Sequence, residues 1–126
     1  MTTLTSLSVS DLLDAFASSA PTPGGGSAAA LAGAMGASLL KMVAAMPKTK
    51  TGAPEEREAL DTAATELERL RHQLARLVDE DTKAYDLVTG AFKLPKGTDE
   101  EKAARSKAIQ DAMRAATQAP LETMRA

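Results

Sequence analysis

The chain has 126 residues, of which 25% are charged, no cysteine and a formal net charge of −2. This length predicts one domain, residues 1–126, and the ordinary charged share argues against intrinsic disorder. The slightly acidic balance argues against a nucleic-acid-binding protein, which requires a clustered basic face. With one histidine and no thiol, the chain is expected to hold no disulfide and no metal.

Two helices are predicted in the first half of the chain. The first spans residues 8–17, with Ser8 as N-cap and Asp11 completing a capping box. Residues 18–27 hold two prolines and three consecutive glycines, which are expected to lie outside a regular helix. The second helix, 28–46, is rich in alanine and glycine, which predicts a buried central helix crossed closely by another backbone.

A membrane-spanning role for the second helix is the less favoured interpretation. The apolar run at 28–40 is shorter than the roughly 20 residues that cross a bilayer, and Lys41 interrupts its extension. The N-terminus has no basic region followed by an apolar stretch, so no signal peptide is predicted and the expected location is cytoplasmic.

Two further helices are predicted in the second half. The third spans about 54–92, where apolar residues keep a heptad rhythm, and a second capping box at Thr98 and Glu101 starts the fourth, which ends near residue 119. Its inward-facing residues are predicted to be Ala104, Ala108, Ile109, Ala112, Met113 and Ala116. Pro120 is predicted to open a fifth helix, so the fold class is an all-α, up-and-down bundle.

Aromatic residues make up only 2% of the chain, so alanine, leucine and methionine must form the core. A core of small residues implies closely packed helices and favours an oligomer that shares its core over an isolated monomer. We therefore expect a homodimer.

Asp81 is the first candidate catalytic residue. It occupies the next heptad position after Leu77 in an otherwise apolar seam, where a carboxylate is costly unless it is paired or used. Tyr85 lies one turn further on the same face, and a carboxylate beside a phenol is a plausible acid–base pair. The alternative is that Asp81 only satisfies a helix end or a lysine. The flanking charged residues are expected to lie on the solvated face: Asp79, Glu80, Lys83 and Asp86.

The glycine-rich turn is the second candidate. Glycines allow close approach of a ligand to the backbone, and the following helix start offers free N–H groups, so Pro23, Gly24, Gly25, Gly26 and Ser27 are candidate substrate-binding residues. A tight helix crossing explains the same residues equally well. Lys48 and Lys50 form a basic loop that could meet a carboxylate tail, with a solvated connector as the alternative.

Two segments resemble the signatures of a known family. The stretch SAPTPGGGSAAALAGA at 19–34 resembles the first signature of the formiminotransferase-cyclodeaminase C-terminal domain family. The pieces DED at 79–81, AY at 84–85 and AFKLPK at 91–96 resemble its second signature, and the similarity runs along essentially the whole chain.

The resemblance implies an all-α bundle, commonly dimeric, that acts on one-carbon derivatives of tetrahydrofolate without a further cofactor. Cyclodeaminases of the family convert 5-formimino- to 5,10-methenyl-tetrahydrofolate and release ammonia, and cyclohydrolases interconvert 5,10-methenyl- and 10-formyl-tetrahydrofolate with water. It further implies that Asp81 acts as general base or cation stabiliser and Tyr85 as proton donor or orienting group. Family members continue for several more helices, so the chain is expected to be a truncated domain.

Two other functions compete with a folate enzyme. A non-catalytic helical module would use the Ala/Gly-rich helix as a dimerisation seam and Asp81 as a register-setting polar residue. A small membrane protein would depend on detergent. Binding of a reduced folate and simple fractionation separate these alternatives.

Overall fold

The computed structural model describes residues 2–46 and 52–126. These ranges contain a short 3-10 helix, η1 (Leu4–Ser6), and four α-helices: α1 (Val9–Ala17), α2 (Gly25–Ala45), α3 (Pro54–Phe92) and α4 (Asp99–Arg125). No strand occurs within them, which confirms the all-α class.

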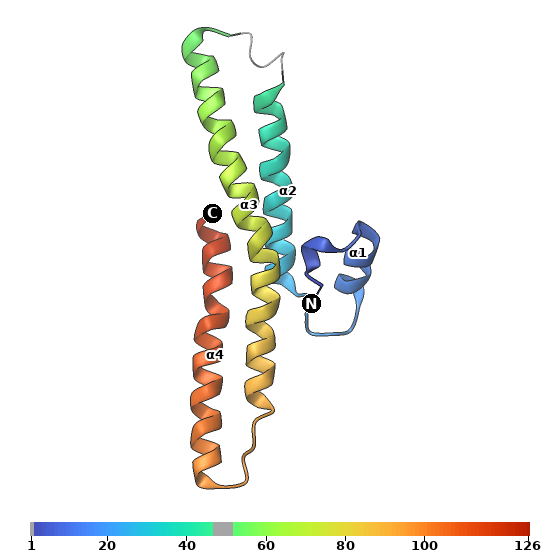
Figure 1. Ribbon diagram of the computed structural model, residues 1–126, viewed down its shortest axis with the longest axis vertical. Coiled ribbons are helices and arrows are strands. Elements are labelled where there is room, and N and C mark those ends of the chain that lie inside the picture. Colours follow the sequence, from blue (N-terminus) through green and yellow to red (C-terminus); the bar gives the residue numbers. More distant parts are fainter. Residues whose placement is uncertain (1, 47–51) are drawn as a thin grey trace.

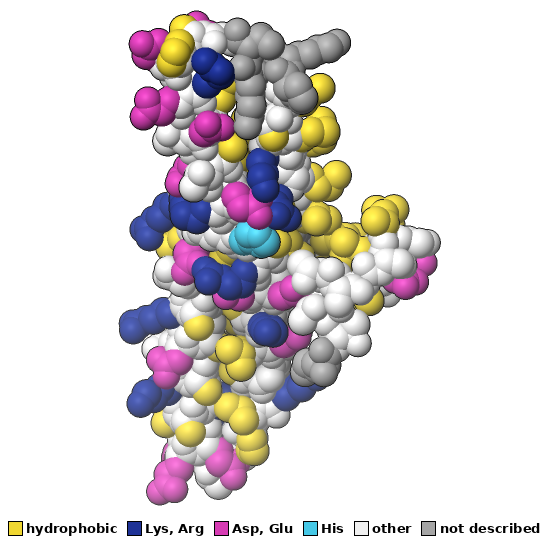
Figure 2. Space-filling view, turned by 45° about the horizontal axis from the view of Figure 1, so that its top comes forward, with side chains coloured by type: hydrophobic (Ala, Val, Ile, Leu, Met, Phe, Trp, Pro, Cys, Tyr) yellow, Lys and Arg dark blue, Asp and Glu magenta, His cyan; other side chains and the backbone are white. Residues whose placement is uncertain are grey.

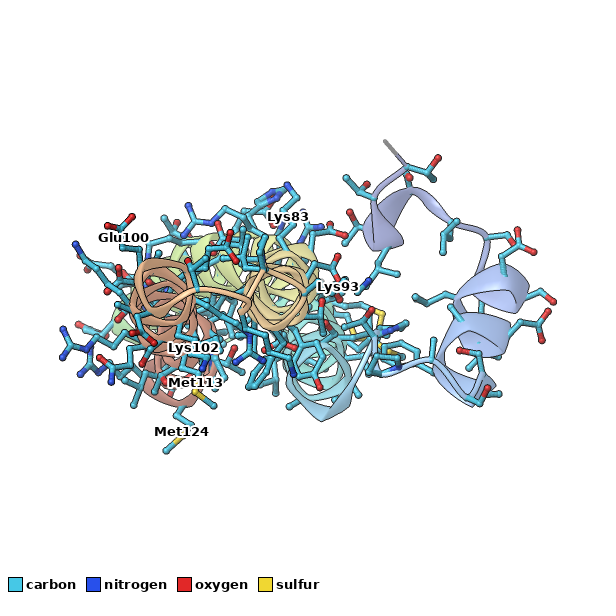
Figure 3. The ribbon with its side chains drawn as sticks, turned by 90° about the horizontal axis from the view of Figure 1, so that it is seen from below. Lys83, Lys93, Glu100, Lys102, Met113 and Met124 are labelled. Carbon is cyan, nitrogen blue, oxygen red and sulfur yellow. The ribbon has the colours of Figure 1, made fainter. Side chains whose placement is uncertain are left out.

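The helix α3 is the spine of the molecule (Figure 1). Its 39 residues extend for about 58 Å at 1.5 Å per residue. The helix α2 packs antiparallel along its first half and α4 antiparallel along its second half, and α2 and α4 meet near its middle (Figure 1). Seen along the long axis, η1 and α1 lie to one side of the three long helices (Figure 3).

Both predicted N-caps start helices, but only the capping box at Thr98 is complete. At Ser8 the Asp11 carboxylate accepts from the serine hydroxyl over 2.7 Å, so the return bond to the Ser8 amide is not formed. The Asp11 amide donates to Ser8 Oγ over 3.1 Å, so α1 begins where predicted. At α4, the Glu101 amide donates to Thr98 Oγ1 over 3.1 Å and the Glu101 carboxylate accepts from the Thr98 amide over 3.3 Å. These side chains satisfy amides that have no partner inside the helix.

Two predicted boundaries were wrong. The helix α2 begins at Gly25, three residues early, because first-turn amides need no carbonyl partner and glycine is tolerated there. No fifth helix opens at Pro120; α4 continues through it to Arg125. Ala119 is buried in the core beside α2 and α3, and this packing holds the last turns in place although Pro120 cannot donate to the preceding turn.

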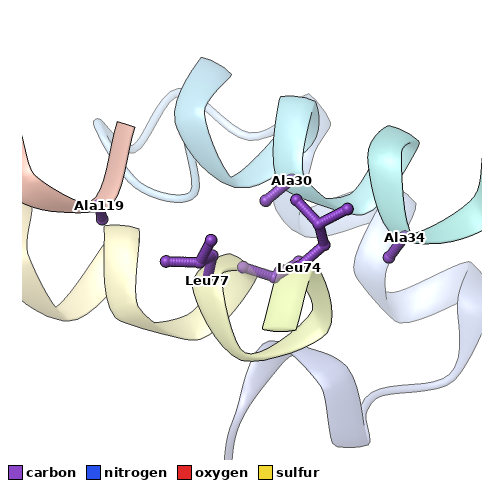
Figure 4. Packing of buried hydrophobic residues seen from close by; sticks show 6 residues of the cluster. Ala30, Ala34, Leu74, Leu77 and Ala119 are labelled. Carbon is purple, nitrogen blue, oxygen red and sulfur yellow. The ribbon is translucent and has the colours of Figure 1, made fainter. Parts of the chain in front are cut away.

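The buried core consists of alanine, leucine and valine side chains, which confirms the prediction for alanine and leucine. The prediction was wrong for methionine, since every methionine in the described residues is exposed. Figure 4 shows the main cluster, which joins α2, α3 and the end of α4 through Ala30, Ala34, Leu74, Leu77, Val78 and Ala119. A Cβ added at Gly33 would lie 3.2 Å from Leu74 Cδ1, so this glycine marks the close helix crossing that the sequence predicted. Gly36 does not, since an added Cβ there meets nothing within 4 Å.

A smaller cluster joins α3 and α4 further along. It contains Val88, Ala91 and Ala112, with Ala108, Ile109 and Ala116 partly buried against it. Ala104 and Met113 were also predicted to face inward, and this prediction was wrong. Ala104 is exposed, and Met113 keeps 52% of its surface exposed. Here α4 contacts only α3 among the described helices, so positions off that single seam stay open.

The helix α2 is apolar on nearly every side, yet only 22% of its most apolar 18-residue window is buried. At 21 residues and a mean hydropathy of 1.6 over that window, it is the one described helix long and apolar enough to cross a membrane. The short run at 28–40 therefore does not by itself exclude a span. Soluble core helices share this composition, and a helix that is apolar all round normally needs covering on several faces.

A charged cluster fastens α2 to α3 beside the apolar core. The Glu68 carboxylate accepts from Lys41 Nζ of α2, from Arg71 Nη2 over 2.6 Å and from His72 Nε2 over 2.9 Å. Hydrogen bonds from Arg71, then Lys41, lower the pKa of Glu68 from 4.5 to about 2.

We expect this cluster to make stability acid-sensitive. A carboxyl whose folded pKa lies below its unfolded value stabilises the fold above the unfolded value, and that stability is lost as pH falls from 4.5 towards about 2. Urea unfolding at several pH values should show this loss. In Glu68→Gln the free energy of unfolding should depend less on pH between 4.5 and about 2. An identical pH profile for the two proteins would contradict the role of Glu68.

Candidate functional site

The glycine-rich turn delivers the chain to an uncapped helix start. Gly24 is the N-cap of α2 in an extended conformation, and within residues 2–46 and 52–126 no side chain caps the first amides of the helix. The turn before it contains the cis peptide bond Thr22–Pro23, with Pro23 half-buried. First-turn amides have no partner within the helix and form its positive end, so this terminus can accept a carbonyl or an anion.

Asp81 of α3 lies directly against this helix start. A Cβ built on Gly26 would sit 2.6 Å from Asp81 Oδ2 and 2.5 Å from its Cγ, closer than real Cβ atoms approach anything. Only glycine therefore fits at position 26 while the carboxylate keeps its place. The two candidates that the sequence treated separately are thus in contact, and the negative charge is half-buried at the positive end of α2.

Ser27 anchors α2 to α3. Its side chain is fully buried, and its hydroxyl donates to the Val78 carbonyl over 2.7 Å. The same hydroxyl lies 3.1 Å from Thr82 Oγ1 and 3.4 Å from Asp81 Oδ2. Ser27 is engaged by protein rather than open to a ligand, and Thr82, which the sequence interpretation missed, joins Asp81 at the joint.

Tyr85 lies one turn beyond Asp81, past the start of α2, and keeps 42% of its surface exposed. Within the described ranges no hydrogen bond links its hydroxyl to the Asp81 carboxylate. The predicted pair therefore shares a helix face without a hydrogen bond between its members, so a bound molecule would have to bridge the two polar groups.

The remaining predicted residues fall into two groups. Lys48 and Lys50 lie outside the described residues. Of the four flanking charges, Glu80 pairs with Arg76 over 3.2 Å, as a solvated face predicts. Asp79 departs from the prediction, because both of its oxygens accept hydrogen bonds from the N-terminal segment.

The chemistry available at this joint follows from its groups. Across residues 2–46 and 52–126 no set of three His, Asp or Glu side chains is arranged to hold a metal ion. Asp81 can accept a proton or stabilise a cation, the uncapped amides of α2 can hold a carbonyl oxygen, and the exposed phenol of Tyr85 can donate a proton. Such groups suit proton transfer to or from a bound polar or cationic molecule.

The chain is similar to known proteins in both sequence and fold. Residues 8–126 match the family model described as formiminotransferase-cyclodeaminase. The chain is 47% identical over 117 residues to a methenyltetrahydrofolate cyclohydrolase of Methylorubrum extorquens, covering 93% of this chain and 56% of that protein. It is 40% identical over 104 residues to the formimidoyltransferase-cyclodeaminase of Rattus norvegicus, covering 79% of this chain and 18% of that protein.

A solved structure agrees with the sequence relatives. The formiminotetrahydrofolate cyclodeaminase of Thermotoga maritima superposes with a TM-score of 0.76 at 28% identity, covering 94% of this chain and 55% of that one. The chain thus spans about half the length of the cyclohydrolase and of the solved cyclodeaminase.

Proposed function

The chain belongs to the formiminotransferase-cyclodeaminase family. We propose that it acts as a folate one-carbon enzyme, either a formimidoyltetrahydrofolate cyclodeaminase or a methenyltetrahydrofolate cyclohydrolase. The folate derivative is the substrate, and no other cofactor is invoked. The contact between Asp81 and Gly26 at the uncapped start of α2 is the observation that carries the proposal.

The proposed roles follow from where each group lies. The methenyl form of the folate is a cation, and a half-buried carboxylate at Asp81 stabilises it and accepts the proton released when the ring closes or water adds. The amides at Gly24, Gly25 and Gly26 hold a pterin oxygen or nitrogen against bare backbone. Tyr85 orients the one-carbon unit from the open side or donates a proton to it. Lys48 and Lys50 are proposed to meet the glutamate tail.

A spectroscopic assay tests this function. Methenyltetrahydrofolate is followed by its absorbance while the protein is offered either that compound in water or 5-formiminotetrahydrofolate. Loss of the methenyl signal identifies a cyclohydrolase, and its appearance with release of ammonia identifies a cyclodeaminase. If neither reaction is accelerated and tetrahydrofolate does not bind, the enzyme proposal is wrong for this chain.

The rival proposal, a non-catalytic helical module, draws on the exposed surface of α2. Its outer residues, continued by the C-cap Met46, follow a heptad pattern without a polar interruption and are all exposed: Ala28, Ala32, Met35, Leu39, Met42 and Met46. Figure 2 shows hydrophobic side chains gathered along this part of the surface. A pure scaffold would use this stripe and leave the glycine turn unprotected from hydrogen exchange when tetrahydrofolate is added.

The same stripe supports a homodimer in either case. A self-complementary apolar stripe with heptad spacing suits a symmetric helix–helix contact with a second copy. Leu39→Lys, at the centre of the stripe, should shift the protein to monomer in sedimentation experiments. Met124→Lys, on an 81% exposed methionine outside the stripe, is the matched control and should leave the state unchanged. A dimer that persists in Leu39→Lys would place the contact elsewhere.

A further inference from the structure

The N-terminal segment is fastened to α3 by Asp79. Oδ1 of this carboxylate accepts from the Leu4 amide over 2.6 Å, and Oδ2 accepts from Thr5 Oγ1 over 2.7 Å. The side chain of Leu4 packs, partly buried, against the main core cluster. Both oxygens of Asp79 are thus committed to holding η1, which is more than a solvated surface carboxylate does.

The far end of the same segment is fastened to the same turn of α3. Ser27 donates to the Val78 carbonyl and contacts Thr82 Oγ1, which fixes the start of α2. Residues 7–24 therefore form a loop whose two ends are both attached to α3. The N-terminal end is held at Asp79, and the C-terminal end is held through Ser27 at residues 78–82. Asp81 lies within this turn, so one turn of helix carries the candidate carboxylate and both attachments.

The segment between the two attachments has little support of its own. The helix α1 has no buried residue, and its Val9 and Leu13 are exposed. Figures 1 and 3 show α1 standing to the side of the long helices. The position of residues 18–24, which lead into the glycine turn, therefore depends on the two ends.

We propose that Asp79 is a positioning residue of the candidate folate site. By holding η1, it fixes one end of residues 7–24 and so sets the direction in which the glycine turn enters α2 beside Asp81. A turn already in place costs no ordering when a ligand binds, so its release weakens binding without removing any group that touches the ligand. This inference rests on the proposed folate function and adds a residue that acts through the turn.

The test compares Asp79→Ala with Glu80→Ala on the whole chain. Asp79→Ala removes both acceptors, whereas Glu80→Ala removes a neighbouring carboxylate bonded only to Arg76 among the described residues. We expect Asp79→Ala to weaken tetrahydrofolate binding about tenfold, the effect of losing one net charge-assisted hydrogen bond. Amide exchange at residues 4–5 and 18–24 should accelerate, while the unfolding temperature and affinity of Glu80→Ala stay near wild type.

Two conservative variants separate positioning from general stability. Asp79→Asn keeps one neutral acceptor and Thr5→Ala removes one of the two donors, so both should fall between wild type and Asp79→Ala in affinity. Equal tetrahydrofolate affinity in wild type and Asp79→Ala, with exchange at residues 18–24 accelerated, overturns the role of Asp79 alone. Failure of the wild-type chain to bind tetrahydrofolate overturns the proposed function itself, and with it the role given to Asp79.

Discussion

Replacing Asp81 by asparagine is expected to lower the turnover of the folate substrate about 10²- to 10⁴-fold, the range that a positioned acid–base group contributes. Asparagine has the same shape, so it still fits against Gly26, but it cannot accept the proton or balance the charge of the methenyl cation. The fold should persist, because among the described residues the Asp81 carboxylate accepts a single, long hydrogen bond, at 3.4 Å from Ser27 Oγ.

The measurement is kcat for Asp81→Asn beside the unfolding free energy of the same protein. Asp86→Asn is the matched control, since it removes an exposed carboxylate from the next turns of the same helix. Turnover equal to wild type in Asp81→Asn would take Asp81 out of the mechanism. A loss of equal size in Asp86→Asn would point to net charge rather than to a placed group.

Introducing alanine at Gly26 should reduce turnover nearly as much as Asp81→Asn does. The free energy of unfolding should change only a little by comparison with this loss of activity. The new Cβ would overlap the Asp81 carboxylate. Because the carboxylate is the free end of its side chain, it can rotate out of the way without moving the backbone. The cost of the added methyl group, about 1–3 kcal/mol, is partly offset by a gain of about 1 kcal/mol from replacing glycine in a helix. The carboxylate would survive but would no longer face the start of α2.

Gly25→Ala is the control for this substitution. An added Cβ at Gly25 meets nothing within 4 Å, so backbone effects are matched and the contact with Asp81 is untouched. We expect its kcat to stay near wild type, while its KM rises because the added methyl group stands where the pterin is proposed to approach the backbone. If Gly25→Ala and Gly26→Ala lose activity equally, the flexibility of the turn matters rather than the place of the carboxylate.

Local signals in the sequence predicted the helices well. The two capping boxes and the heptad rhythm identified the starts of α1 and α4 and the whole of α3, because these features act within one or two turns. The prediction failed at Pro120, where the burial of Ala119 among residues distant in sequence outweighs a local helix-breaking preference. The predicted burial of Ala104 and Met113 failed for the same reason, since the exposure of a side chain on α4 depends on which helices surround it.

The sequence alone predicted that Asp81 interrupts an apolar seam and that the glycines at 24–26 expose their backbone. It did not predict that Gly25 to Ser27 form the first turn of α2. The contact between Asp81 and this turn became visible in the folded chain, where Gly26 leaves room for the Asp81 carboxylate. The tertiary structure also gave Asp79 its partners in η1, more than 70 residues away in the chain. Spacing along a helix tells which residues share a face, but the element facing them is selected by packing across the whole chain, and packing therefore brought these groups together.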